Sequence, residues 1–350
     1  MEINKEIIDN DKKTYPESPR TIETIVQLFD SFGVTRIYLN DHNSINQANH
    51  LGRGACASVY KSKYRGKIVS IKKMELYKDS PFLILSLYYI LSQIAINDII
   101  ISQCLSSINF PTIQKIYGYD IMYQRNKIYL LLIKKYYDCE LLEFLQSDEF
   151  NNISDKHKQH LLSNIILHVL LTFKYIFIEQ FNGRYADATL RNILIQRTDE
   201  QYVQYGNIKL RLLGYKPVII DFGHSNIVFK NKFIMRTNWR SEDLSRSIAH
   251  QLQNQPNDKS FDLFNFFHYL YLESFGNYNL KESLLKESNN KTISSNWMFI
   301  TFLNLIYDIG FTKLDRPIND EYYKPNCLPL DDFLNTKIVK NYLENSYFLE

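Results

Sequence analysis

The sequence predicts an α+β protein with an antiparallel sheet near its start and a larger, mostly helical part after it. Two observations lead to this prediction. Short β-like runs separated by glycines occupy residues 49–73, as in a hairpin followed by a third strand. Apolar stretches without glycine at residues 81–108 and 161–178 have the length and composition of buried helices.

Composition narrows the class of protein. The chain has 350 residues, 45% of them hydrophobic, so it can bury one large core or two modest ones. Its 41 basic and 38 acidic residues are interleaved and give a net charge of +3, so charge alone implies no nucleic-acid partner. Abundant Asn, Ile, Lys, Tyr and Phe are typical of an AT-rich genome, such as that of a protist or a large DNA virus.

Cysteine spacing and hydropathy predict an intracellular protein. The four cysteines are far apart and form no Cys-x-x-Cys pair, which argues against a disulfide framework and against a zinc site. Residues 1–13 lack the apolar core of a secretory signal, and no uninterrupted apolar run is long enough to span a bilayer. We therefore expect reduced thiols, no membrane partner, and a cytoplasmic or otherwise intracellular location, within a host cell or virion if the protein is viral.

The first part of the chain is expected to contain an extension and a small lobe. Residues 1–45 would form the extension, with one short amphipathic helix at 21–32 where apolar residues recur at helical spacing. Residues 46–135 would form the small lobe. It would hold the three strands, the helix at 81–108 and a buried strand at 128–133.

A larger lobe is expected over residues 136–350. A helix would begin it at 140–145, followed by the second of the long apolar helices. Two short strands, 193–195 and 218–220, flank a hairpin-like insertion, and the chain from about residue 239 has a helical pattern.

A glycine-containing segment stands at the end of the first expected strand. It reads Leu51-Gly52-Arg53-Gly54-Ala55-Cys56-Ala57-Ser58-Val59-Tyr60. Glycines let backbone N–H groups approach phosphates, but two glycines beside a strand are more often a tight hairpin turn. From these residues alone both interpretations stay open.

Two charged residues stand on elements expected to be buried. Lys72 closes the third strand in Val69-Ser70-Ile71-Lys72, where it is either a solvated lysine or a ligand for an anion. Asp98 lies on the apolar stripe of the 81–108 helix, and a carboxylate there needs a partner unless it turns to solvent.

Three further polar residues stand beside apolar strands. Asp187 and Asn192 belong to Tyr185-Ala186-Asp187-Ala188-Thr189-Leu190-Arg191-Asn192, and Asp221 is followed by Phe222-Gly223. Carboxylate and amide oxygens suit the metal ions of a nucleotide. For any one Asp or Asn, a turn-forming role is the commoner explanation.

The order of these motifs along the chain resembles that of the protein kinase superfamily. In that family a glycine-rich loop is followed by a strand lysine, then by Asp-x4-Asn, and then by Asp-Phe-Gly. The resemblance covers about residues 48–320. Within the family, the chain is similar to divergent serine/threonine kinases such as the haspin-like kinases and those of large DNA viruses. It implies a bilobal protein kinase fold, with an antiparallel-sheet N-lobe at 46–135 and a mostly helical C-lobe at 136–350. The implied activity is transfer of the ATP γ-phosphoryl to Ser or Thr hydroxyls of a protein substrate.

The resemblance also implies residue roles. Lys72 would contact the α- and β-phosphates and Asp98 would pair with it, while Asp187 would orient the acceptor hydroxyl and take its proton. Asn192 and Asp221 would hold Mg²⁺. The nucleotide, bound in the cleft between the lobes, would be contacted by Lys72, Asn192 and Asp221 together with Leu51, Gly52, Arg53, Gly54, Ala55, Ser58 and Val59.

The chain departs from the family pattern at several positions. No glutamate occurs between Glu75 and Glu140, where the family places the partner of the lysine, so Asp98 is the best substitute. Tyr185-Ala186 replaces the usual His-Arg, so phosphorylation-gated activation is not expected. Thr189 replaces a lysine near the γ-phosphate.

These departures leave two alternatives open. The first is a pseudokinase that serves as a nucleotide-binding scaffold. The second is a small-molecule phosphotransferase of related fold.

Late in the chain, three more residues resemble family positions. Asp262 resembles a buried helix aspartate that supports the catalytic loop, and Glu242 with Arg316 resembles a family salt bridge.

Overall fold

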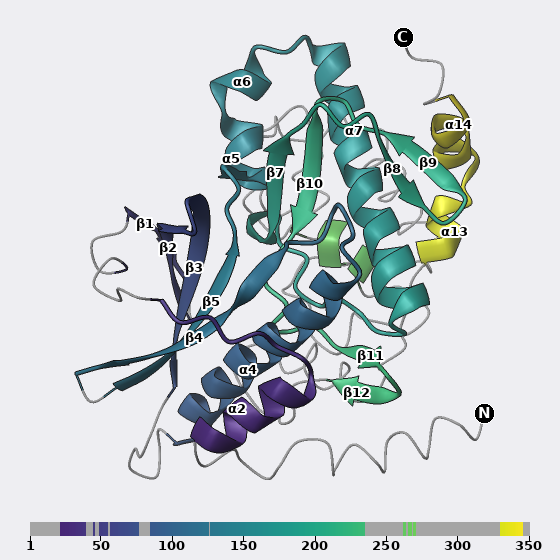
Figure 1. Cartoon of the computed structure of the whole chain (residues 1–350). Coiled ribbons are helices and arrows are strands. Elements are labelled where there is room, and N and C mark those ends of the chain that lie inside the picture. The colour runs from purple at the N-terminus through teal and green to yellow at the C-terminus, as the bar shows by residue number, and fades with distance from the viewer. Residues whose placement is uncertain are drawn as a thin grey trace. The chain divides into compact units, whose positions relative to one another are not determined.

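The computed structural model describes residues 22–39, 45, 49–54, 57–76, 85–125, 127–234, 262–263, 265–267, 269–270 and 330–345. The chain divides into two compact units: Met1–Tyr137 with Asp221–Trp239, and Asp138–Ile220 with Arg240–Glu350. The described elements include a five-stranded antiparallel sheet and several helices, which confirms the α+β class (Figure 1).

The first unit is built on that sheet, whose strand order is β1-β2-β3-β5-β4. The expected hairpin and third strand are confirmed, and so is the strand around residues 128–133. The sequence analysis missed one strand, β4. The bounds are β1 Asn49–Arg53, β2 Ala57–Tyr64, β3 Lys67–Leu76, β4 Ile116–Gln124 and β5 Lys127–Lys135.

Helix α4, Leu85–Ser107, contacts β3 and β4 and confirms the expected long helix (Figure 1). Every side chain from Gln93 to Ser102 is buried, so this part of α4 is enclosed on all sides rather than along one stripe. On the other face of the sheet, a hydrophobic cluster holds Val69, Ile71, Met122, Leu131 and Ile133 together with Ile45. The sheet is therefore buried on both faces, and its α4 side carries Lys72.

The N-terminal segment is part of the first unit. Helix α2, Ile22–Ser31, confirms the expected helix and buries Ile25 and Phe29. The Phe29 ring meets Tyr119 of β4 edge to face, with ring centroids 4.7 Å apart. Beyond α2, the backbone N–H of Ile37 donates to the Tyr119 carbonyl at 2.6 Å. This segment therefore pairs with β4, the last strand of the sheet, whose edge would otherwise have unpaired backbone groups at this point.

Gly118 makes that pairing possible. Its φ is +152°, and a Cβ there would lie 2.3 Å from the carbonyl oxygen of Thr35 and 2.8 Å from the Ile37 side chain. The register of β4 against β5 shifts between Ile116 and Gly118. A side chain at this position would push the N-terminal segment off the strand.

The second unit contains the long central helix. Helix α7, Asp155–Thr172, continues into a π-helical stretch, Phe173–Gln180. Asp155–Gln180 is long and apolar enough to cross a membrane by composition, but most of it is buried within the protein, as in the core helix of a globular domain. Every side chain from Leu161 to Phe173 is buried.

Short helices and small sheets surround α7. The expected strands near 193–195 and 218–220 are confirmed as β7 and β10, and the insertion between them is the β8–β9 hairpin. The bounds in this unit are α5 Leu141–Gln146, α6 Asp148–Asn151, β6 Cys139–Glu140, β7 Ile193–Arg197, β8 Tyr202–Tyr205, β9 Ile208–Arg211, β10 Tyr215–Ile219, α13 Leu330–Leu334 and α14 Lys337–Asn345. Hairpin β11–β12, Ile227–Phe229 and Lys232–Ile234, belongs to the first unit.

Several expectations fall outside the described residues. These are Ala55, Glu242, Arg316 and most of the helical region after residue 239. The described residues at 262–263, 265–267 and 269–270 are helical, in agreement with that expectation.

The buried side chain of His168 makes the stability of the second unit depend on pH. Its Nδ1 lies 2.9 Å from the Tyr205 hydroxyl oxygen and its Nε2 lies 3.1 Å from the Arg211 carbonyl oxygen. Burial lowers the pKa of His168 from 6.5 to about 4. Between these values the unfolded chain binds a proton that the folded protein does not, so stability falls as pH falls from 6.5 to 4.

We expect this histidine to reduce the free energy of unfolding by about 3 kcal/mol over that range. Urea unfolding at several pH values would measure the slope for the wild type and for His168→Gln. The variant should show a slope smaller by about one proton between pH 4 and 6.5. Equal slopes would contradict the assignment.

Candidate functional site

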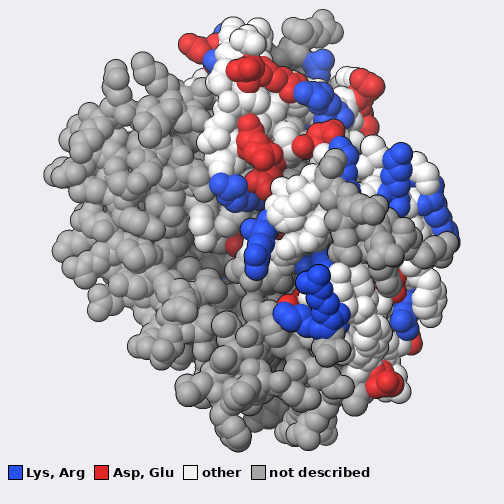
Figure 2. All heavy atoms as spheres, turned by 90° about the vertical axis from the view of Figure 1, so that its left-hand side faces the viewer, with Lys and Arg blue, Asp and Glu red and all other residues white. Residues whose placement is uncertain are grey.

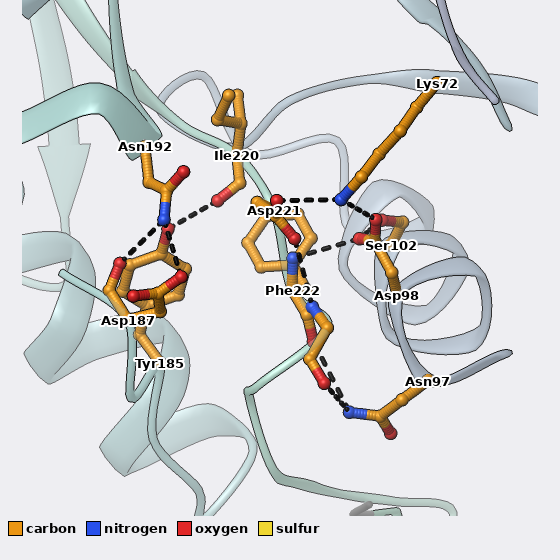
Figure 3. Close-up of polar contacts among 11 residues, drawn as sticks. Lys72, Asn97, Asp98, Ser102, Tyr185, Asp187, Asn192, Ile220, Asp221 and Phe222 are labelled. Atoms are coloured by element: carbon orange, nitrogen blue, oxygen red, sulfur yellow. Dashed lines mark hydrogen bonds and ion pairs between the residues drawn. The ribbon is translucent and has the colours of Figure 1, made fainter. Parts of the chain in front are cut away.

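In the first unit, one lysine is shared by two carboxylates. Lys72 Nζ, from β3, lies 2.8 Å from Asp98 Oδ2, on α4, and 2.7 Å from Asp221 Oδ2 (Figure 3). Lys72 and Asp98 are buried, whereas the Asp221 side chain is 29% exposed. The expected contact between Lys72 and Asp98 is present, although aspartate is a methylene shorter than glutamate. Because α4 packs directly on β3, the shorter side chain reaches.

The charges of this group stabilise one another. Burial alone would lower the pKa of the Lys72 ammonium, but Asp221 and Asp98 outweigh burial, so the pKa is raised. Burial alone would raise the pKa of Asp221, but Lys72 and then Lys134 outweigh it, so the pKa is lowered. Lys134 stands opposite Ser70 on β5, and burial lowers its pKa. Lys72 is therefore a fixed cation and Asp221 a fixed anion at neutral pH.

The chain turns sharply at Asp221 and is held by α4 after it. Asp221 has φ +59°, a conformation that costs a non-glycine residue free energy. The next backbone N–H, of Phe222, donates to Asp98 Oδ1 at 3.0 Å, and Ser102 donates to the same oxygen at 3.2 Å. Asp98 therefore uses one carboxylate oxygen for Lys72 and the other for the turn that carries Asp221 (Figure 3).

The glycine-containing segment ends β1 and opens the β1–β2 hairpin. Gly54 N–H donates to the Ala57 carbonyl at 2.9 Å. A Cβ on Gly52 or Gly54 would meet no described atom within 4 Å, and neither glycine has a positive φ. Neither packing nor turn geometry among the described residues therefore requires glycine at these two positions. Leu51 is exposed, and Ser58 and Val59 are half-buried.

In the second unit, Asp187 and Asn192 are joined directly. The Asn192 amide nitrogen donates to Asp187 Oδ2 at 2.7 Å and to the Asp187 carbonyl at 3.1 Å (Figure 3). Both contacts use the nitrogen end of the amide. Asn192 ends a short 3-10 turn, Leu190–Asn192, directly before β7. This turn brings the side chain of Asn192 back to that of Asp187.

Tyr185 anchors the segment that carries Asp187. Its fully buried ring stacks on Phe173 and packs against Phe177, both from the π-helical stretch, with ring centroids 5.7 Å and 5.5 Å away. Its hydroxyl donates to the carbonyl of Ile220, and the Ile220 N–H donates to the Asn192 carbonyl at 3.0 Å. The residue that departs from the family pattern thus ties the Asp187 segment to the end of the strand before Asp221.

Asp262 holds the same segment from the other side. It is buried and accepts the backbone N–H groups of Tyr185 at 2.8 Å and Ala186 at 2.7 Å. Ala186 has φ +68°, which is unusual for alanine. The backbone just before Asp187 is therefore strained and is held by a buried side-chain carboxyl group.

The donor set fits magnesium. Mg²⁺ prefers oxygen ligands and is commonly held by one or two side-chain oxygens plus substrate phosphates. Asp221 supplies a partly exposed anionic carboxylate. Asn192 commits its nitrogen to Asp187, so its amide oxygen is the end left for a cation. Among the described residues no group of three or more His, Cys, Asp or Glu gathers as a metal site.

Charged side chains of both signs occur on the described part of one face of the protein (Figure 2). On the described part of the face drawn in Figure 2, basic and acidic side chains lie side by side. This mixture agrees with the interleaved charges of the sequence.

Comparison with known proteins gives no family assignment, since the chain matches no protein-family model and no curated protein sequence. The geometry of the two groups of residues therefore carries the functional argument.

The sequence analysis missed two residues around Asp98 and Asp221. Asn97 donates to backbone carbonyls after Asp221, and Lys134 adds a second buried ammonium. Both stand on elements whose apolar character was clear from the sequence. For Asn97 the available signal was a polar residue inside an apolar run, whereas Lys134 directly follows an apolar run and looks like an ordinary lysine at a strand end.

Proposed function

We propose that the protein is a protein kinase that transfers the γ-phosphoryl group of Mg-ATP to Ser or Thr hydroxyls of a protein substrate. In this proposal the first unit corresponds to the kinase N-lobe and the second to the C-lobe. Residues 46–135 and 136–350 remain the approximate bounds, with the segment after Asp221 folded onto the first unit.

One observation supports the proposal above the others. Lys72, Asp98 and Asp221 come from three distant parts of the chain, yet a carboxylate oxygen of each aspartate lies within 2.8 Å of Lys72 Nζ. These are the three residues that the family motifs lead us to expect together. If each aspartate only formed a local turn, the two carboxylates would not be expected to contact the same buried lysine. An ordinary buried ion pair would also need only one carboxylate.

Each residue receives a role that its surroundings permit. Lys72, a fixed cation, would bind α- and β-phosphate oxygens, and Asp98 would hold it in place. Asp187 would orient the acceptor hydroxyl and accept its proton. Asp221 and Asn192 would hold Mg²⁺, which when bound neutralises charge on the transferring phosphoryl group.

The glycine-containing segment supports a nucleotide ligand. Gly52 and Gly54 are glycines that the described packing does not require, which is expected where a ligand must approach the backbone. Leu51, Arg53, Ala55, Ser58 and Val59 complete the proposed nucleotide contacts.

The departures from the family pattern do not remove the reacting groups. Asp98 takes the place of the missing glutamate at hydrogen-bonding distance, and Tyr185 in place of histidine anchors the loop. These contacts favour a working enzyme over a pseudokinase scaffold. The glycine-containing segment followed by Val69-Ser70-Ile71-Lys72, and the roughly 40 residues between Asp221 and Asp262, favour a protein kinase over a small-molecule phosphotransferase. The experiment below distinguishes these two activities.

The test is transfer of labelled γ-phosphate from ATP to a mixture of casein, histone and myelin basic protein. We expect wild-type protein to label Ser and Thr. Asp187→Asn and Asp221→Asn should each lower the rate by at least about 100-fold while the fold is retained. Asp155→Asn is the matched control, because this side chain is 98% exposed at the start of α7. It should leave the rate unchanged.

Three results would contradict the proposal. Equal labelling by the wild type and both site variants would place the activity elsewhere. Binding of Mg-ATP, seen as a raised melting temperature, without any labelling would favour the scaffold. Labelling of choline or an aminoglycoside, with none of protein, would favour the small-molecule phosphotransferase.

A further inference from the structure

Asn97 holds the turn that follows Asp221. Its side chain is buried, and its amide nitrogen donates to the carbonyl of Phe222 at 3.4 Å (Figure 3). The same nitrogen donates to the carbonyls of Gly223 and Ser225 at 3.0 Å each. These carbonyls lie 125 to 128 residues further along the chain. One side chain on α4 therefore binds three backbone carbonyls, of residues 222, 223 and 225, just after the proposed metal ligand.

Asn97 acts with its helical neighbours. Ile94, Asn97 and Asp98 are spaced at i, i+3 and i+4, so they share one face of α4. Asp98 accepts the Phe222 N–H at 3.0 Å. A Cβ on Gly223 would lie 2.5 Å from Ile94 Cγ2 and 3.3 Å from the Ile94 carbonyl oxygen. The turn thus lies so close to α4 that only glycine fits, and both its N–H and its C=O groups are held there.

The turn needs this support. Asp221 occupies a left-handed conformation that is unfavourable for aspartate, and such a conformation persists only where surrounding contacts impose it. The hydrogen bonds from α4 begin at the next residue, Phe222, and so hold the chain directly after Asp221. Without Asn97, Asp98 would still bind the Phe222 N–H, but the carbonyls of residues 222, 223 and 225 would lose a shared donor.

We propose that Asn97 is a positioning residue for Asp221, setting the affinity of the protein for the magnesium ion of the nucleotide. The proposal rests on the proposed function, because it takes Asp221 as a metal ligand. Residues that orient a metal ligand from behind it typically change metal affinity 10–100-fold when they are replaced. A residue that only supported packing would affect stability but leave this affinity unchanged.

The experiment measures metal binding directly. Mn²⁺ replaces Mg²⁺ as a spectroscopic probe, and electron paramagnetic resonance follows its binding to the protein with a non-hydrolysable ATP analogue. Asn97→Ala should weaken Mn²⁺ binding at least about 10-fold. It should also speed amide hydrogen exchange at residues 222–225. Both readouts are independent of turnover.

Asn164→Ala is the matched control. Asn164 is an equally buried asparagine whose amide nitrogen also donates to a backbone carbonyl, that of Arg211 at 2.9 Å, but it belongs to the second unit. The control should lose stability yet bind Mn²⁺ as the wild type does. If Asn97→Ala does not fold, Asn97→Leu replaces it, since leucine has a similar volume and leaves no cavity but still removes the amide donor.

The outcomes separate the two proposals. Wild-type protein that binds no Mn²⁺ with the nucleotide analogue would overturn the proposed function itself. If Asn97→Ala or Asn97→Leu binds Mn²⁺ as tightly as the wild type does, the role of Asn97 alone is overturned. Equal weakening by the Asn97 and Asn164 variants would also overturn it, because the effect would then come from general loss of stability.

Discussion

Replacing Lys72 with methionine is expected to lower the free energy of unfolding by roughly 3–5 kcal/mol, the usual effect of removing one partner from a buried ion pair. Methionine keeps most of the side-chain volume but removes the charge. Asp98, which is fully buried, would then face Asp221 without the cation that both now contact. Urea unfolding of the variant and the wild type would measure the loss.

A double-mutant cycle identifies the cause. Asp98→Asn keeps an oxygen that can accept the Phe222 N–H but removes the buried negative charge. The double variant should therefore be more stable than the sum of the two single losses predicts, by about 1–3 kcal/mol. Additive losses would show that Lys72 and Asp98 do not interact as the geometry indicates.

Lys216→Met provides the control. Lys216 has a side chain as buried as that of Lys72, and its Nζ lies 2.6 Å from Glu200 Oε1. The Glu200 side chain is 53% exposed, so removing the lysine leaves an acid that water can solvate. We expect a loss of no more than about 1 kcal/mol. An equal loss at both lysines would mean that the buried carboxylates of the first group do not matter.

The sequence predicted which residues form this site, because the order of the motifs along the chain identified Lys72, Asp98 and Asp221. The helix register placed Asp98 on the same face of α4 as Ile94, and the structure brings Asp98 within hydrogen-bonding distance of Lys72. Such a prediction works because position along a helix or strand fixes which face a side chain occupies. The same reasoning located α2, β1 to β3, α4, β5 and the strands that flank the β8–β9 hairpin.

The parts that the sequence did not predict depend on close approach between distant segments. Strand β4 contains Gly118, which reads as a strand breaker until Thr35 is seen against it. From the sequence, Asn97 is an ordinary polar residue in an apolar helix; in the structure it binds the carbonyls of residues 222, 223 and 225. Neither partner lies near in sequence, so no local pattern shows that the glycine or the amide is needed.

Asp262→Asn should lower both stability and turnover. The carboxylate accepts two buried N–H groups, from Tyr185 and Ala186, and hydrogen bonds to charged groups contribute about 1.5–3 kcal/mol each. An amide can accept only one of them and turns its own donor toward the other. We expect the free energy of unfolding to fall by about 3 kcal/mol, measured by urea unfolding.

The effect on turnover follows from the strain at Ala186. Its φ of +68° is held by the bond to Asp262, and the next residue is Asp187. When that bond is lost, the backbone can relax and move the Asp187 carboxylate. A displacement of about 1 Å in a catalytic group can lower the rate about 100-fold. We therefore expect kcat to fall by about that factor, with little change in the KM for ATP, in assays at a temperature where the variant is folded.

Asp120→Asn separates the two effects, because Asp120 has the same chemistry in the first unit. It is equally buried and accepts two backbone N–H groups, from Leu39 at 2.9 Å and Ile121 at 2.8 Å. Its replacement should cost about as much stability, yet kcat measured on folded protein should stay near the wild-type value. A comparable fall in kcat for both variants would show that lost stability, rather than the position of Asp187, limits turnover. Unchanged kcat in Asp262→Asn would mean that the strained backbone at Ala186 does not place the proposed base.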